Sequence, residues 1–486
     1  MKIGPWRIEA ALLQRFLAEA ITKGSALILA FLLARWLAVE GFGAYSQTQA
    51  LVAVLVPLAL LGLGFAIVRQ IAGATTTQDI ASPIATAFLL VSLTSISIGV
   101  VLWFTAVPLA GVFSNHPSAV ALIRAAAVLL PVAGWQTLFL EALRARQRVR
   151  AATAIQIGEA LFALSGVVAL LWLDTLTPVT AIALITAVKT VFLIWAVADL
   201  FFSQAIRPTQ LVLLSPRCIR TALVLGIPIM IAGLGEVMMG FVDRLLIGSM
   251  AGSDTVGRYV AAQTLIAILA SWGAPYWWLL YPRMARALAD KAHAEAIATV
   301  HRLFGAFILY AAPLAALLAI LGPGVLALAI GEEYRMSHAV MAALAAAVFV
   351  NQSATPWEYS LYISGRALFL MIASLFWGAC ALAAIATLLP QMGLLGAAIA
   401  VAGARLGFAV TVVLGARQQG MGAVLLPPGL TLRTLAALGG GILAAAIAAF
   451  ITAQAEIAWM SAVLFLVAYG LIAFGVPSLQ ARRASR

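Results

Sequence analysis

The chain is a succession of apolar segments of about 20 residues each, joined by short polar or basic connections. A helix of that length crosses a hydrocarbon core of roughly 30 Å, whereas a barrel strand needs only about 10 residues of alternating character. Of the 486 residues, 64% are hydrophobic and 9% are charged, and the mean hydropathy is +1.08. These features predict an all-α integral membrane protein and exclude a soluble globular fold.

The sequence contains about 14 candidate membrane spans. They cover approximately residues 12–35, 46–68, 84–106, 119–140, 152–172, 178–199, 222–248, 259–280, 303–321, 339–362, 367–388, 394–416, 434–453 and 457–476. The first span lacks a signal-peptide cleavage pattern, so we expect the protein to retain it. Most of the 29 basic residues fall in alternate connections, for example at 144–150. By the positive-inside rule, this pattern predicts a multi-pass protein with both termini in the cytoplasm.

The same sequence motif occurs at two junctions between spans, 214 residues apart. Gly43, Tyr45 and Gln49 form the pattern G-x-Y-x-x-x-Q, and Gly257, Tyr259 and Gln263 repeat it. Six spans separate the two copies, an even number, so both copies have the same orientation. The repeat predicts two parallel six-helix lobes with two further helices. The expected boundaries are 1–206 for the first lobe, 207–420 for the second, and 421–486 for the last two helices and a cytoplasmic tail.

The repeated glycine and tyrosine also have local interpretations. We expect Gly43 to let the chain turn after a helix, in a conformation that is closed to other residues. Tyr45 is placed where the polar tip of an aromatic ring favours the membrane interface. Both residues are therefore interpreted as structural rather than as substrate contacts.

The motifs "EGFGAY", "GLGFAIVRQIA" and "DRLLIG", together with the tandem lobes, resemble the polysaccharide transporter family. These are Wzx-type flippases, in the superfamily that also holds MATE exporters and the lipid II flippase MurJ. The resemblance implies lobes around a central cavity that opens alternately to each side. It also implies translocation of undecaprenyl-pyrophosphate-linked oligosaccharides across the inner membrane for cell-surface or exopolysaccharide biosynthesis. The implied partners are that substrate, membrane lipids, and a polysaccharide polymerase and ligase.

Several charged residues fall inside the predicted spans. Lys23, Lys189 and Arg405 lie near the middle of spans one, six and twelve, and Arg124 and Arg244 lie nearer the outer side of spans four and seven. A charge at the bilayer centre costs roughly 2.5–3.5 kcal/mol, so such residues usually face the interior of the bundle. The five bases are candidates for a cationic cavity that binds pyrophosphate. The alternative is that each base satisfies a neighbouring carboxylate or carbonyl group.

Two acids in span seven are candidates for ion coupling. Glu236 and Asp243 share one helix face with Gly233 and Gly240, and such a small-and-polar stripe lines a close helix contact or a cavity. Each acid is a candidate proton or sodium site.

No pattern in the sequence indicates catalysis, and we expect no enzyme activity, no cofactor and no metal. The four histidines lie in or near loops without ligand spacing, and there is no P-loop. Basic charge is spread over many short loops, so nucleic acid is not expected as a partner. The alternatives left open are a MATE-like cation-coupled exporter of small amphiphiles, a lipid II-type flippase, and a membrane-embedded enzyme or assembly component.

Overall fold

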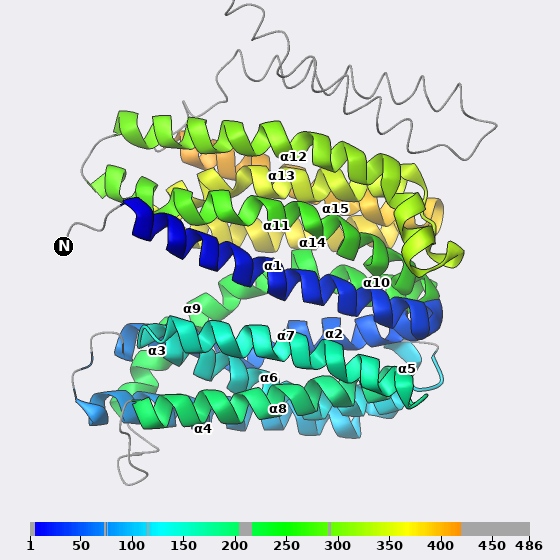
Figure 1. Ribbon diagram of the computed structural model, residues 1–486, viewed down its shortest axis with the longest axis horizontal. Coiled ribbons are helices and arrows are strands. Elements are labelled where there is room, and N and C mark those ends of the chain that lie inside the picture. Colours follow the sequence, from blue (N-terminus) through cyan, green and yellow to red (C-terminus); the bar gives the residue numbers. More distant parts are fainter. Residues whose placement is uncertain are drawn as a thin grey trace, which may run out of the picture. The chain divides into compact units, whose positions relative to one another are not determined.

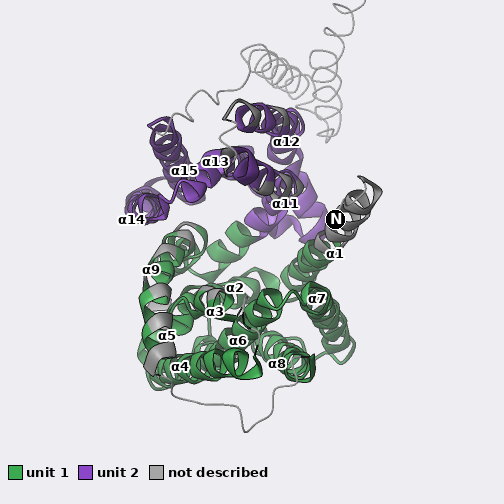
Figure 2. Ribbon diagram, turned by 90° about the vertical axis from the view of Figure 1, so that its left-hand side faces the viewer, with its two compact units in different colours: residues 1–260 green, residues 261–486 purple. Residues whose placement is uncertain are grey.

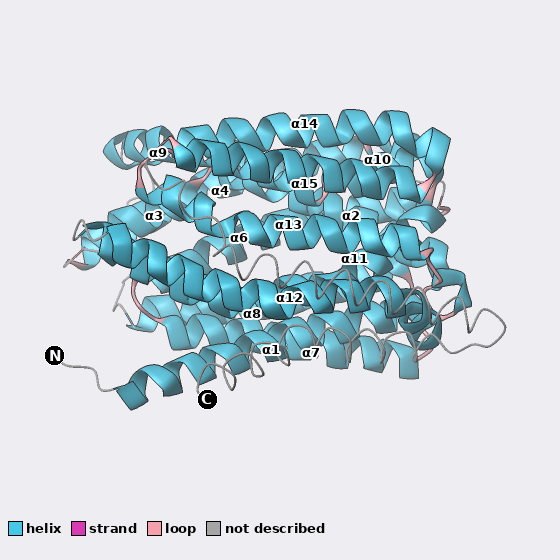
Figure 3. Cartoon of the chain, turned by 90° about the horizontal axis from the view of Figure 1, so that it is seen from above, coloured by secondary structure: helices cyan, strands magenta, loops and turns pink. Residues whose placement is uncertain are grey.

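The computed structural model describes residues 5–71, 74, 76–113, 116–203, 216–289 and 293–418. These residues are helical apart from short turns and contain no β-strand (Figures 1 and 3), which confirms the all-α class. Nine helices within these residues are long and apolar enough to cross a membrane, as expected of a multi-pass membrane protein. The predicted spans at 434–453 and 457–476 lie outside the described residues.

The chain packs as two compact units, residues 1–260 and 261–486 (Figure 2). The helices of the first unit are α1 (Pro5–Trp36), α2 (Ala38–Leu60), α3 (Leu63–Ile71), α4 (Thr77–Phe104), α5 (Ala106–Phe113), α6 (Ala119–Ala145), α7 (Val149–Trp172), α8 (Pro178–Ser203), α9 (Pro216–Gly240) and α10 (Val242–Ala251). The helix α11 (Ser253–Ala289) begins in the first unit and continues into the second. The second unit also contains α12 (His293–Ile330), the 3₁₀ helix η2 (Glu332–Tyr334), α13 (His338–Ile363), α14 (Ala367–Met392) and α15 (Leu394–Arg417).

Each of the first twelve predicted spans coincides with one of these helices or with a consecutive pair of them. The pairs are α2 with α3, α4 with α5, and α9 with α10. Because α9 packs against α2, α3 and α4, and α10 packs against α2, both belong to the first compact unit. The lobe boundary predicted from the repeat, between residues 206 and 207, falls in a segment outside the described residues and stays a prediction.

The break between α2 and α3 depends on glycine. Leu61 and Gly62 have φ values of +50° and +68°. A Cβ atom on Gly62 would lie 2.0 Å from the carbonyl oxygen of Gly226, and one on Gly226 would lie 2.3 Å from that of Leu61. The backbones of the α2–α3 connection and of α9 are therefore in direct contact, which any larger residue would prevent.

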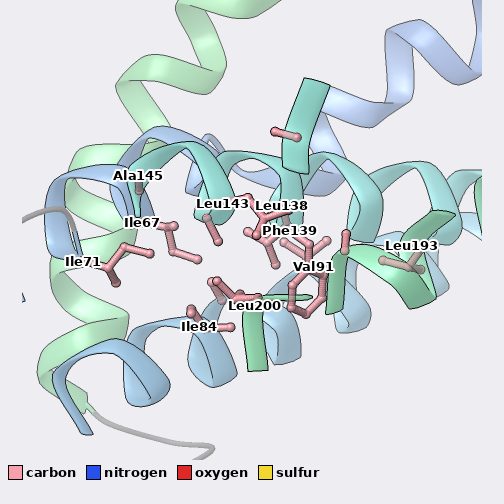
Figure 4. Packing of buried hydrophobic residues seen from close by; sticks show 14 of the residues in the cluster. Ile67, Ile71, Ile84, Val91, Leu138, Phe139, Leu143, Ala145, Leu193 and Leu200 are labelled. Atoms are coloured by element: carbon pink, nitrogen blue, oxygen red, sulfur yellow. The ribbon is translucent and has the colours of Figure 1, made fainter. Parts of the chain in front are cut away.

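The core of the first unit lies between α3, α4, α6, α7 and α8 (Figure 4). Leu63, Ile67 and Ile71 are spaced four residues apart, so they form one face of α3, and all three are at most 1% exposed. They join Leu138 and Leu143 of α6, both 0% exposed, in one cluster. This packing holds α6 and α8, which carry charged residues, in fixed positions.

Two arginines in the turn between α6 and α7, Arg146 and Arg148, define what we call the basic end of this unit. Both bind groups on other helices or turns. Nη1 of Arg146 donates to the carbonyl oxygens of Ile71 and Ala74, at 3.0 and 3.1 Å. Nε of Arg148 donates to Oδ2 of Asp199 at 3.1 Å, and this carboxylate raises the pKa of the arginine. Arg146 therefore caps the C-terminal end of α3, and Arg148 joins the start of α7 to α8 by an ion pair.

The second unit has an aromatic core formed by α11, α12 and α13. The rings of Trp277 and Phe307 lie 4.8 Å apart, and Phe304 meets Trp357 edge to face at 5.1 Å. Nε1 of Trp277 donates to Oε1 of Gln352 at 2.9 Å, so the buried indole has its hydrogen-bond partner.

Candidate functional site: a polar triad and the repeated junction

Lys189 lies near the middle of α8 and forms a polar triad with Glu159 of α7 and Gln136 of α6, in which each side chain binds both others. Nζ of Lys189 makes an ion pair with Oε1 of Glu159 and donates to Oε1 of Gln136 at 3.0 Å. Nε2 of Gln136 donates to Oε2 of Glu159 at 2.7 Å. For Lys189, the structure thus shows the carboxylate partner that sequence analysis named as the alternative.

The triad is partly exposed. The side chains of Lys189 and Glu159 are 27% and 21% exposed, whereas Gln136 is 2% exposed. A charged pair at mid-span is expected to turn its exposed side toward water or a polar path rather than toward lipid, because exposure to hydrocarbon is costly. The arrangement can bind an anion at the ammonium group, and it can gain or lose one proton at the carboxylate.

Lys23 is in α1, the helix that packs against α7, and its side chain is exposed. Lys23 and Glu159 each lie thirteen residues before the last residue of their helices, Trp36 and Trp172, and the two helices run in the same direction (Figure 1). The two residues therefore lie at the same distance along their helices from these ends.

Arg405 is in the second unit, on α15. Its Nη1 donates to Oδ1 of Asn351 on α13 at 2.9 Å. Asn351 belongs to a polar stripe on that helix, with Thr355 and Glu358 at the following turns. That Arg405 acts together with Lys23 and Lys189 on a single substrate group stays a prediction.

The two bases predicted nearer the outer side both lie over aromatic rings. The guanidinium carbon of Arg124 is 5.4 Å from the ring centre of Trp103, and that of Arg244 is 5.2 Å from the ring centre of Phe241. Arg124 is exposed and Arg244 is half-buried. Both rings thus stabilise the positive charge locally.

Asp243 lies where the seventh predicted span is broken. α9 ends at Gly240 and α10 begins at Val242, which places Asp243 in the first turn of α10. Its side chain is 3% exposed; Oδ1 accepts from the backbone N–H of Arg244 at 2.8 Å, and Oδ2 accepts from the hydroxyl of Tyr259 at 2.9 Å. Interrupted helices recur at binding sites of membrane transporters, because they free backbone groups for a ligand. Glu236 lies on α9, and its side chain is outside the described part of the structure.

The two copies of the repeated junction meet each other within the first unit. A Cβ atom on Gly43 would lie 1.7 Å from the carbonyl oxygen of Ser253, and one on Gly257 would lie 2.2 Å from that of Val39. Val39 and Ser253 each stand four residues before the glycine of their own copy, so the contact is reciprocal. The expected turn role of Gly43 is wrong: it lies inside α2, and the left-handed residue at the turn is Ala38, with φ of +56°. Glycine is needed because two backbones touch.

The tyrosines of the repeat are buried inside the protein. Tyr45 is 8% exposed, and its hydroxyl accepts from Nε2 of Gln49 at 3.0 Å. Tyr259 is 0% exposed and donates to Asp243. Each hydroxyl therefore has a partner inside the protein, and the interface depth expected for Tyr45 stays a prediction.

Sequence reasoning missed Gln47 and Gln136, which are 0% and 2% exposed. Oε1 of Gln47 accepts from Oγ of Ser253 at 3.1 Å, and a Cβ atom on Gly248 would lie 1.7 Å from Nε2 of Gln47. The available signal was an amide residue within an otherwise apolar span, since such a group needs a partner there.

Solved structures show where else this fold occurs. The chain is similar to the lipid II flippase MurJ in an inward closed conformation, with a TM-score of 0.72 and 12% identity over 97% of this chain and 99% of that one. It is also similar to an inward-facing multidrug resistance MATE family transporter of the MOP superfamily, with a TM-score of 0.67 and 15% identity over 84% of this chain and 95% of that one. For a Vibrio cholerae MATE transporter the TM-score is 0.61, with 14% identity over 84% of this chain and 97% of that one.

These TM-scores show that the chain shares its fold with these solved transporters and this flippase. No curated protein matches the chain in sequence. The family model described as polysaccharide biosynthesis protein matches residues 13–288, which is more than half of the chain. The chain therefore belongs to the polysaccharide biosynthesis protein family.

Proposed function

We propose that this protein is a flippase that moves undecaprenyl-pyrophosphate-linked oligosaccharide units across the inner membrane, for cell-surface or exopolysaccharide biosynthesis. The family match and the MurJ-like and MATE-like fold support transport of a substrate for polysaccharide synthesis. The observation that carries the proposal is Lys189, a partly exposed ammonium group at the middle of a membrane span. A cation in this position attracts a diffuse anion such as pyrophosphate.

In the proposed mechanism, Lys23, Lys189 and Arg405 successively or jointly contact the pyrophosphate as it crosses. Point charges offset the cost of moving phosphate oxygens away from water, whereas the polyprenyl tail stays in lipid. Rocking of the two lobes, 1–206 and 207–420, opens the path to one side at a time. Both termini are in the cytoplasm, a polysaccharide polymerase and ligase use the product, and the protein itself catalyses no covalent step.

Asp243 and Glu236 are the proposed ion-coupling residues. The buried carboxylate of Asp243 at a helix break is the observation that favours the second candidate function, a cation-coupled exporter of the MATE type. The lipid II-type flippase is the third, supported by the fold shared with MurJ. Both alternatives predict transport that continues when the lipid-linked oligosaccharide of the cell is absent.

The test is the appearance of lipid-linked oligosaccharide in the outer leaflet of cells that carry Lys189→Glu or Arg405→Glu. We expect transport to fall at least about tenfold, because each change replaces an attraction for the anion by a repulsion. Arg335→Gln is the control, since Arg335 pairs with Glu332 at an exposed helix turn, where the arginine lowers the pKa of that acid. Wild-type transport by both Glu variants at normal expression would refute the cationic path.

A further inference from the structure

The polar triad has two ways of satisfying its hydrogen bonds, and only one of them uses Lys189. In the structure, Lys189 donates to both Glu159 and Gln136, and Gln136 donates to Glu159. If Lys189 turns to another anion, a protonated Glu159 can donate to Oε1 of Gln136 while it still accepts from Nε2. The acid and the amide then form a neutral, bidentate pair in which neither side chain lacks a partner.

We propose that Glu159 is an internal counter-anion of Lys189, which the pyrophosphate of the substrate displaces, and that Glu159 takes up one proton from water as the pyrophosphate binds. The proposal rests on the proposed function and identifies the residue that adapts the site to its substrate. Glu159 keeps Lys189 neutralised while the site is empty, since an isolated ammonium group at this depth is costly. After displacement, an unpaired carboxylate is costly for the same reason, so it accepts a proton.

The charges around the triad are compatible with this exchange. The helices packed against α6, α7 and α8 from the same unit are α1 to α5. Their described titratable side chains, with those of α6, α7 and α8, are Lys23, Arg35, Glu40, Tyr45, Asp79, Arg124, Glu141, Arg144, Arg150, Glu159, Lys189 and Asp199. Among these described side chains, only Lys23, Glu159 and Lys189 lie near the middle of their helices. Among these described mid-helix charges, neutralisation of Glu159 leaves the two positive ones, Lys23 and Lys189, for a multiply charged anion.

Binding that takes up one proton has a measurable signature. The affinity for pyrophosphate rises as the pH falls, by up to about tenfold per pH unit beyond the effect of the ligand's own protonation. Glu159→Gln mimics the neutral acid permanently. We expect this variant to bind pyrophosphate at least about tenfold more tightly than the wild type at about pH 8.5, and to lose the additional pH dependence.

The experiment is calorimetric titration of the purified protein in lipid nanodiscs with inorganic pyrophosphate, from about pH 6 to about pH 8.5. Glu141→Gln is the matched control, because Glu141 is also a paired acid, held by Arg144 near the basic end at 2.6 Å. It should behave as the wild type does. Lys189→Met should bind at least about tenfold more weakly. The ligand's own protonation is common to all these proteins and cancels in the comparison.

If Glu159→Gln has the wild-type affinity and pH dependence while Lys189→Met loses binding, Glu159 is not the counter-anion, although the cationic site stands. If the wild type binds no pyrophosphate while cells still export the glycan, the inference fails and the flippase function remains. Loss of both binding and export refutes both. Should Glu159→Gln not fold, titration of the wild type in buffers of different ionisation enthalpy decides: uptake of about one additional proton supports the proposal, and none refutes it.

Discussion

Tyr45 and Tyr259 hold the same position in the two copies of the repeat, yet their hydroxyl groups have different tasks. Tyr259 donates to the buried carboxylate of Asp243, whereas Tyr45 accepts from the amide of Gln49. A hydrogen bond to a buried charge is worth more than one between neutral groups. Removing one hydroxyl oxygen from each tyrosine therefore compares a hydrogen bond to a carboxylate with one to an amide.

We expect Tyr259→Phe to destabilise the protein by about 1–3 kcal/mol, because a buried carboxylate loses a donor. Tyr45→Phe should cost only about 0.5–1.5 kcal/mol, because a half-buried neutral amide loses its acceptor. Thermal unfolding of both variants in the same lipid nanodiscs measures the difference. Equal shifts of the two unfolding temperatures would show that Asp243 does not depend on Tyr259.

At the scale of helices, the reciprocal contact of Gly43 and Gly257 joins the starts of α2 and α11. Each glycine faces a backbone carbonyl oxygen, and a backbone atom cannot move aside as the end of a flexible side chain can. Because the contact is reciprocal, the same geometric requirement is met twice. This arrangement is expected of two chain segments related by a local two-fold axis.

Gly43→Ala and Gly257→Ala should each destabilise the protein by about 3 kcal/mol or more, because the added methyl group forces the two helices apart. The matched control is Gly403→Ala on α15, where a Cβ atom meets nothing within 4 Å. That change should be neutral or stabilise by up to about 1 kcal/mol through helix propensity. The yield of folded protein after solubilisation measures all three; normal yields for the Gly43 and Gly257 variants would contradict the close contact.

At the scale of the whole molecule, the distribution of basic loops predicts the topology. Single cysteines at positions 115 and 147 should be labelled by an impermeant thiol reagent from opposite sides of the membrane, because one helix, α6, separates them. The background for this assay is a chain whose two native cysteines are replaced by Ala. Labelling of both positions from the same side would contradict the predicted fourteen-span topology.

The sequence alone was sufficient for the membrane class, for the helices that coincide with the first twelve spans, and for the family resemblance. These properties depend on the length and apolar character of local segments, which a single span carries within itself. The mid-span position of Lys189 was evident for the same reason. The repeated motif was also visible, although its glycine was misinterpreted as a turn residue.

Only the tertiary structure showed which side chains meet. Lys189, Glu159 and Gln136 come from three helices. Glu159 and Gln136 precede Lys189 in the chain by 30 and 53 residues. Whether they meet depends on which helices are neighbours and how each is rotated about its axis, and apolar residues on all sides of a span leave that rotation undetermined. The same holds for Gly43 against Ser253, a contact of two backbones. Partition into the membrane is a property of each segment, whereas packing is a property of pairs of segments. Only the tertiary structure therefore determines which helices pack together and through which faces.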